Sequence, residues 1–435
     1  MNDMKVPKRI SNIIINALQG GVVPPMGLGY IAVGREQEIN ALLKDIEIIE
    51  DGGATFRLLT GKYGSGKTFL LQTIKEHAIA KGFVVAFADL SPDRLLSGTN
   101  VNKKGLATYR ELLANICIKS SPTGGGLDKI LDGWINSVWM DVAQSLSGGA
   151  VAGADLEKLV NKKIYETISD MQNMVHGYDF SNVLTKYWNA SRNDNHEDKS
   201  KALRWLKGEY PTKSEAKLDL GVPIIINDDD WFDYIKLFSK LFHNMGYNGF
   251  IIMIDELINV SKCVRASTRQ RNYEKMLSMY NDALQGRASY LGIIMGGTPS
   301  SVENRYNGVF SYEALRSRLR SGGFSDASII NLMAPIIRIQ PLNTSEIIVL
   351  LEKLTSIHSE LYQYQSNITS DDIISFINEV FDKKTYDLVT PRSIIRDYID
   401  VLNTMLQNSS LSINDVLSNY KWNEDVEEEP EETDD

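Results

Sequence analysis

Short runs of apolar residues alternate with amphipathic segments along most of the chain. Each run is bounded by glycine or other turn residues, as is typical of strands that are buried on both faces. The five clearest runs are 56–60, 83–90, 250–254, 291–295 and 335–339. Segments with apolar residues at helical spacing lie between them. The alternation predicts an α/β fold: a doubly wound parallel sheet of five strands with helices on both faces.

The second and third runs are much further apart in the sequence than the others, which indicates an insert between them. We expect residues 120–245 to form this insert, mostly as helices, with a loop at the polar run 189–200. Five of the six tryptophans fall in it, which is enough aromatic surface for a small core of its own. The predicted core domain is therefore discontinuous, over 1–119 and 246–342.

Helical periodicity returns after the fifth run. Apolar residues recur at i, i+3 and i+4 over 343–361, Thr369 and Asp372 have the form of a capping box, and Pro391 opens a further helix. We expect a helical lid over 343–420, followed by a disordered acidic tail over 421–435.

The tail dominates the charge of the chain. The formal net charge is -10 at pH 7, and the residues from Glu424 to Asp435 include nine carboxylates and no basic residue. The rest of the chain is therefore nearly neutral and can carry a local basic face, so the acidic balance does not exclude a nucleic-acid partner.

Cysteine and histidine usage indicates neither a disulfide framework nor a zinc site. Cys117 and Cys263 have no C-x-x-C partner, and the five histidines are scattered. No apolar run approaches the roughly 18 residues that a membrane span requires, and the first twenty residues lack the pattern of an export signal. These features predict a cytoplasmic protein without a membrane span.

Residues 61–68 match G-x-x-x-x-G-K-T, the Walker A pattern, between an apolar run and a helical stretch. Glycines let successive N–H groups surround phosphate oxygens, Lys67 brings a positive charge to the β and γ oxygens, and Thr68 can ligate Mg²⁺. An accidental glycine turn is the alternative. The sequence predicts a phosphate loop that binds ATP with Mg²⁺, through Gly61, Tyr63, Gly64, Ser65, Gly66, Lys67, Thr68 and Phe69.

The third apolar run ends in two adjacent carboxylates, Asp255 and Glu256. ATP hydrolysis needs one group that holds Mg²⁺ and another that orients the attacking water, so we assign Asp255 to the metal and Glu256 to the water. Acids are also common in turns, which is the alternative. Thr298 follows the fourth run and can point toward the γ-phosphate; otherwise its hydroxyl caps a turn.

The residues described so far resemble the AAA+ ATPases, in which a strand-end polar residue senses the γ-phosphate and a helical lid folds over the nucleotide. Val33-Gly34-Arg35-Glu36 is similar to the opening segment of the branch that contains origin-recognition and helicase-loader proteins. The resemblance implies that Arg35 lies near the adenine. It also implies that Arg392, in Thr390-Pro391-Arg392, is a second sensor that reaches back to the phosphates; a solvent-facing arginine is the alternative.

The same resemblance implies an arginine finger between the fourth and fifth runs and, with it, a homo-oligomer. Arg316, Arg318 and Arg320 compete for the role. Arg316 and Arg320 share a helix face, whereas Arg318 points about 200° away from Arg316, and we favour Arg318. If Leu315 and Leu319 face the core, all three arginines can instead form a solvated stripe.

The segment 257–273 contains four basic residues and no acidic one, and it follows the carboxylate pair. Such a segment can contact DNA phosphates or a neighbouring subunit, although four basic residues at a helix start are more often solvated. The DNA candidates are Lys262, Arg265, Arg269 and Arg271, or the insert.

A closer resemblance covers most of residues 5–407. The phosphate loop, the long insert, the segment from Ala202 to Glu209, and Thr390-Pro391-Arg392 resemble the BrxD-like ATP-binding proteins of the BREX phage-resistance system. This resemblance implies a bacterial defence protein that acts beside a helicase-like or other DNA-processing partner.

Three functions fit the sequence. The first is an ATPase that couples nucleotide state to assembly on DNA or with a helicase-like partner. The second is a nucleotide-dependent switch or scaffold with slow hydrolysis and no direct DNA binding. The third, a small-molecule kinase, is disfavoured because such enzymes rarely need an arginine-bearing helical lid.

Overall fold

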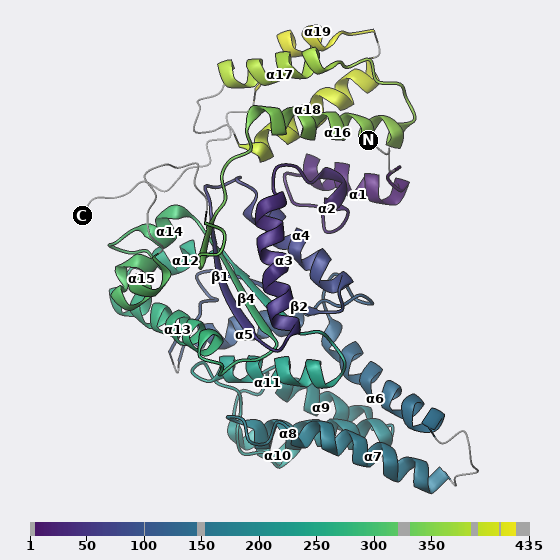
Figure 1. Ribbon diagram of the computed structural model, residues 1–435, viewed down its shortest axis with the longest axis vertical. Helices are drawn as coiled ribbons and strands as arrows, with labels where there is room; N and C mark the ends of the chain where they lie inside the picture. Colours follow the sequence, from purple (N-terminus) through teal and green to yellow (C-terminus); the bar gives the residue numbers. More distant parts are fainter. Residues whose placement is uncertain are drawn as a thin grey trace. The chain divides into compact units, whose positions relative to one another are not determined.

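The computed structural model describes residues 5–99, 101–145, 153–320, 331–383, 390–408 and 410–422 (Figure 1). Within these limits the chain divides into two compact units. One contains Ala41–Thr60 and His77–Ile337, and we call it the sheet unit. The other, the lid unit, contains Met1–Asn40, Gly61–Glu76 and Arg338–Asp435.

The sheet unit is built on a five-stranded, all-parallel sheet. Its strand order is β2-β3-β4-β1-β5, so β4 lies between β1 and β3. β3 and β4 are buried along their whole length, which explains their continuous apolar sequences. The five predicted strands are confirmed, as β1 Ala54–Thr60, β2 Val84–Asp89, β3 Phe250–Asp255, β4 Leu291–Gly297 and β5 Ile336–Arg338.

Helices pack against this sheet: α5 on β2, α11 on β3 and α13 on β1. Two helices, α3 and α4, have residues in both units. The helices of this layer are α3 Glu36–Glu50, α4 Lys67–Ala80, α5 Lys104–Ala114, α11 Trp231–Asn244, α12 Ile258–Ser261, α13 Ala266–Leu284, α14 Pro299–Glu303 and α15 Glu313–Leu319, with a 3-10 turn at Val309–Ser311.

The insert is helical, as predicted, but it does not have a separate core among the described residues. Trp134, Trp188, Trp205 and Trp231 belong to the same apolar cluster as the strands, so the insert extends the core of the sheet unit. Its helices are α6 Gly126–Ser145, α7 Gly153–Ser169, α8 Gly177–Arg192, α9 His196–Leu206 and α10 Lys213–Leu220.

The predicted loop at 189–200 is wrong. α8 continues to Arg192, and α9 begins at His196, so only three residues connect the two helices. The side chain of Asn195 accepts a hydrogen bond from the Asp198 N–H at 3.1 Å and caps α9. Local capping and pairing of α8 with α9 let this polar sequence form helix, which composition alone does not reveal.

The lid unit combines both ends of the chain. Helices α1 Lys8–Gln19 and α2 Leu28–Ile31 share one apolar core with the four C-terminal helices. The first 40 residues, which we expected in the core domain, therefore group with the lid, because the apolar stripe of α1 packs on α16 and α18. The C-terminal helices are α16 Thr344–Tyr362, α17 Ser370–Lys383, α18 Pro391–Gln407 and α19 Ile413–Asn419.

Three further expectations concern a helix cap, the acidic tail and the membrane. Thr369 and Asp372 make the reciprocal hydrogen bonds expected of a capping box, at 2.8 and 3.3 Å between backbone nitrogen and side-chain oxygen. The acidic residues from Glu424 onward lie outside the described residues. None of the described helices has both the length and the apolar character of a membrane span.

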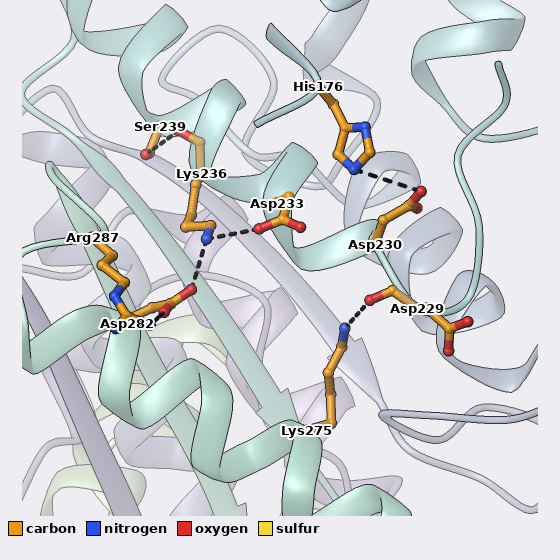
Figure 2. A network of polar contacts seen from close by, with 9 residues as sticks. All are labelled: His176, Asp229, Asp230, Asp233, Lys236, Ser239, Lys275, Asp282 and Arg287. Carbon is orange, nitrogen blue, oxygen red and sulfur yellow. Dashed lines mark hydrogen bonds and ion pairs between the residues drawn. The ribbon is translucent and has the colours of Figure 1, made fainter. Parts of the chain in front are cut away.

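A network of ion pairs, centred on the buried Asp282, joins helix α11 to helix α13 (Figure 2). Lys236 of α11 pairs with Asp233 at 2.7 Å and with Asp282 of α13 at 2.6 Å. Burial by itself would lower the pKa of Lys236, but the hydrogen bonds and charges of the two aspartates outweigh it and raise the pKa. About two turns before Asp282, Lys275 of α13 donates to the Asp229 carbonyl.

Replacing Lys236 by methionine should therefore destabilise the protein, because among the described residues Asp282 would keep Arg287, at 3.5 Å, as its one ionic partner while staying buried. We expect a loss of about 3 kcal/mol in the free energy of unfolding by urea titration. Lys162→Met, which removes a cation from an exposed pair, is the matched control and should change little. Equal unfolding midpoints for the two variants would contradict this role for the network.

Candidate functional site

The phosphate loop begins directly after β1, at Gly61. Gly64 and Gly66 have φ angles of 70° and 93°, a conformation that side-chain-bearing residues rarely adopt. Lys67 is the first residue of α4, and its ammonium donates to the carbonyls of Gly61 and Lys62 at 2.8 and 3.0 Å. The helix N-terminus and the lysine charge thus meet at the loop, as binding of a phosphate requires.

One buried polar atom of the loop has hydrogen-bonding capacity that the described residues do not use. Ser65 is 3% exposed, and its hydroxyl has no hydrogen-bond partner among the described residues. A side chain at Gly61 would overlap this hydroxyl, so the glycine is required by close approach. The donor set of backbone N–H groups, a lysine and hydroxyls matches the phosphates of a nucleotide.

Arg35 holds the loop from inside the lid unit. Its side chain is buried, and one nitrogen, Nη2, donates to the Ser65 carbonyl at 2.9 Å and to the Gln340 carbonyl at 2.6 Å. Burial lowers the pKa of this guanidinium, and the charges of Glu38 and Glu346 oppose the shift. The structure therefore shows Arg35 as a positioning residue of the loop, while its contact with an adenine stays a prediction.

The predicted second-sensor stretch lies beside the loop within the lid unit. Thr390 caps α18 in a capping box with Ser393, and a side chain at Gly64 would overlap Thr390. Arg392 is two residues further on and is exposed. The remaining loop residues include Tyr63, whose ring centroid is 5.4 Å from the Lys67 ammonium, and Phe69, which packs on the apolar core of the lid unit.

In the sheet unit, Asp255 is the last residue of β3 and is 3% exposed. Its Oδ1 accepts a hydrogen bond from the Glu256 N–H at 2.8 Å. Gly296 of β4 lies against this carboxylate, and a methyl group there would overlap Oδ1. Glu256 itself has a φ of 62°, a left-handed conformation that costs about 1 kcal/mol or more in a residue other than glycine. The carboxylate pair is thus held in a specific, strained arrangement.

A third carboxylate joins the pair, and the sequence did not single it out. Asp89 ends β2 and lies in register with Asp255. Asp89 reaches solvent, but partial desolvation of its carboxylate, together with the negative charges of Asp255 and Glu256, raises its pKa to about 6. The signal in the sequence is an acid at the end of a predicted strand, but only the strand order shows which strand is its neighbour.

The other predicted residues are placed as follows. The Thr298 hydroxyl accepts from the Ser301 N–H at 3.2 Å and caps α14, which is the alternative that the sequence left open. Leu315 and Leu319 are fully buried, so the condition for a solvated arginine stripe is met. Arg318 and Arg320 are exposed, and Arg316 lies half-buried, with one nitrogen 3.4 Å from the Phe310 carbonyl. The sensor and finger roles stay predictions.

The strand order brings the ends of three strands to neighbouring positions. β4 pairs with β1 so that Gly297 faces Thr60, and it pairs with β3 on its other side. Parallel strands end at the same edge of a sheet, so the residue before the phosphate loop, Asp255 and Thr298 all belong to one edge. Within the sheet unit, three neighbouring strands thus end at one edge, at Thr60, Asp255 and Gly297.

The described residues include no group of three or more histidine, cysteine, aspartate or glutamate side chains arranged to hold a metal. Mg²⁺ at a nucleotide, however, uses only one or two protein ligands and takes the rest from phosphates and water. A hydroxyl such as that of Thr68 and a carboxylate such as that of Asp255 are suitable donors. The residues therefore fit Mg²⁺ bound together with a nucleotide.

Replacing Gly296 by alanine should displace Asp255. We expect a loss of about 1–3 kcal/mol in unfolding free energy from this overlap. Gly133→Ala is the matched control, because a side chain at Gly133 in α6 would meet nothing within 4 Å. That control should be neutral or stabilising, as alanine is the better helix former. A Gly296→Ala protein as stable as the control would refute the close contact.

Asp89→Asn should stabilise the nucleotide-free protein at pH 8. The charged form of Asp89 is disfavoured in the folded state, and this penalty is absent at low pH and grows as the pH rises from 3.8 toward 6. The gain in melting temperature should therefore shrink when the pH is lowered below 6. Asp141→Asn, an exposed carboxylate of α6, controls for the loss of one charge. A gain that does not depend on pH would contradict the shift.

A family model described as BREX system ATP-binding protein BrxC/D matches residues 6–421, which is nearly the whole chain. No curated protein sequence matches the chain well enough to count as a relative. The family match includes the phosphate loop, the insert, the carboxylate pair and the C-terminal helices. The chain therefore belongs to the family of BREX system ATP-binding proteins BrxC/D.

Proposed function

We propose that this BREX-family ATP-binding protein hydrolyses ATP at the sheet edge where β1, β3 and β4 end. The observation that carries the proposal is the strand order, because it supports a phosphate loop and a carboxylate pair that act on the same nucleotide. The strained Glu256 adds support, since such conformations are concentrated at functional sites.

Each residue has a role that follows from its chemistry. The loop N–H groups and Lys67 bind the β- and γ-phosphates, and Thr68 and Asp255 would hold Mg²⁺, which neutralises charge on the phosphate oxygens when bound. Glu256 orients a water and accepts its proton as the water oxygen attacks the γ-phosphorus and the bond to the β-phosphate breaks. In this proposal Thr298 and Arg392 sense the γ-phosphate, and Arg318 completes the site of a neighbouring copy.

We propose that hydrolysis drives a conformational change in the lid unit and that a partner recognises this change. Arg35 supports this step, because one of its nitrogens binds both the loop carbonyl of Ser65 and the carbonyl of Gln340, three residues before the cap of α16. A shift of Ser65 on release of phosphate would lengthen or break one of these two hydrogen bonds. The coupled partner is DNA, a helicase-like defence protein, or other copies of the chain.

A nucleotide-dependent switch with slow turnover is the second candidate. Two observations favour it. The Thr298 hydroxyl already caps α14, and Arg318 is exposed to solvent. A single copy would then hydrolyse ATP slowly, and turnover would depend on assembly.

Two variants test the proposal. Lys67→Ala should weaken ATP binding by about a hundredfold, because it removes the charge at the β- and γ-phosphates. Glu256→Gln should bind ATP normally and hydrolyse it at least about a hundredfold more slowly, because the general base is lost. Binding is measured by calorimetry and turnover by phosphate release, with Glu274→Gln, an exposed acid of α13, as the control. Normal turnover by Glu256→Gln would overturn the assignment of the base.

A further inference from the structure

Two segments of the sheet unit together form a basic surface that the sequence shows only in part. The first comprises the described residues 95–99 and 101–105, after β2, and the second comprises residues 257–273, after β3. Since β2 and β3 are adjacent and parallel, both segments leave the sheet at the same edge. They contain six basic residues and no acidic residue: Lys103, Lys104, Lys262, Arg265, Arg269 and Arg271.

Side chains of α13 fasten the first segment to the second. Arg271 donates to the Gly98 carbonyl at 3.0 Å. Asn272 is fully buried, and its Oδ1 accepts from the N–H groups of Leu96 and Ser97 at 2.8 and 2.9 Å. The described residues of the two segments are therefore fixed to each other, and together we call them the basic surface.

The insert holds the same segment from the other side. Asp228 is 4% exposed, and its carboxylate accepts from the N–H groups of Gly98, Gly105 and Leu106. The chain that follows Asp228 is held in place as well. Lys275 of α13 donates to the Asp229 carbonyl, Asp230 pairs with His176, and Lys236 pairs with Asp282 of α13 (Figure 2). Buried polar anchors of this kind fix the lysine-bearing segment against both elements.

The cations of this surface divide into anchors and solvent-facing groups. Arg269 donates to the carbonyls of Cys263 and Val264 at 2.6 and 3.1 Å, and Lys104 donates to the Pro92 carbonyl at 2.6 Å. Lys262 and Arg265 are exposed, and Lys103 is half-exposed. The groups offered to a ligand thus come from both segments, not from the four residues of 257–273 alone.

The backbone adds positive potential at the same place. Helix α13 has Arg265 at its N-cap, no side-chain cap and no acid in its first turn. By contrast, Asp228 accepts from the first N–H groups of α5. The N-terminal end of the nineteen-residue α13, which carries the positive end of the helix dipole, therefore lies within the basic surface. No acid of its first turn offsets this positive potential.

We propose that the basic surface binds the phosphodiester backbone of nucleic acid. Lysine is depleted in the cores of protein–protein interfaces, whereas nucleic-acid interfaces are rich in positive charge. The large apolar side chains exposed on the described part of the two segments are Val101 and Val264, which offer little area for a protein partner. The proposal goes beyond ATP hydrolysis and does not depend on it.

The test is fluorescence anisotropy with a short labelled DNA duplex and the matching single strand, without nucleotide, over a range of salt. Lys103→Ala and Arg265→Ala, one from each segment, should each weaken binding, and the double variant should lose about tenfold or more at low salt. The slope of log affinity against log salt should fall by about one for each phosphate contact removed. Lys162→Ala with Lys163→Ala, exposed lysines of α7, removes the same charge elsewhere and should bind as the wild type does.

Asn272→Ala tests whether binding needs the segment after β2 to be fixed against α13, because this substitution changes no charge. It should weaken binding while thermal melting shows a folded protein, and a loss of folding would leave the Lys103 and Arg265 variants to decide. Equal weakening by the Lys162 and Lys163 control would show that only net charge matters and would overturn the proposal. Absence of binding to both DNAs would also overturn it, as would equally tight binding of polyglutamate with the same dependence on Lys103 and Arg265.

Discussion

The position of Asp255 depends on a missing side chain in the neighbouring strand. Gly296 of β4 leaves room for the Asp255 carboxylate, which in turn accepts the N–H of Glu256. Because β4 lies between β3 and β1, the same strand also fixes the place where the phosphate loop begins. The close contact at Gly296 thus positions Asp255 and the backbone of Glu256, and the pairing of β4 with β1 separately positions Thr60, the last residue before the loop.

In each unit, buried polar groups hold loop segments of the chain in place. Arg35 binds the phosphate loop and the segment before α16 within the lid unit. In the sheet unit, Asp228 and Asn272 do the same for the segment after β2. Each of these residues is buried and satisfies backbone groups that a loop would otherwise leave unpaired. The loops that carry the proposed chemistry are therefore positioned by a few polar side chains, not by apolar packing alone.

The sequence predicts the strands and the phosphate loop well, because both depend on local pattern: all five strands and the loop before α4 are where the pattern puts them. It does not predict strand order, so Asp89 could not be recognised as the neighbour of Asp255. Composition also failed for 189–200, where the Asn195 cap makes helix from polar residues. The packing of α1 with the lid helices and the role of Arg35 depend on contacts between distant segments, which no local pattern encodes.

The central claim is that ATP bound to this protein is hydrolysed. The most direct measurement is a single-turnover experiment with excess protein and ATP labelled at the γ-phosphate, in which bound and released phosphate are followed with and without Mg²⁺. Bound ATP should be converted to ADP and labelled phosphate when Mg²⁺ is present. Recovery of the bound ATP unchanged in the presence of Mg²⁺, including at protein concentrations that favour assembly, would contradict it.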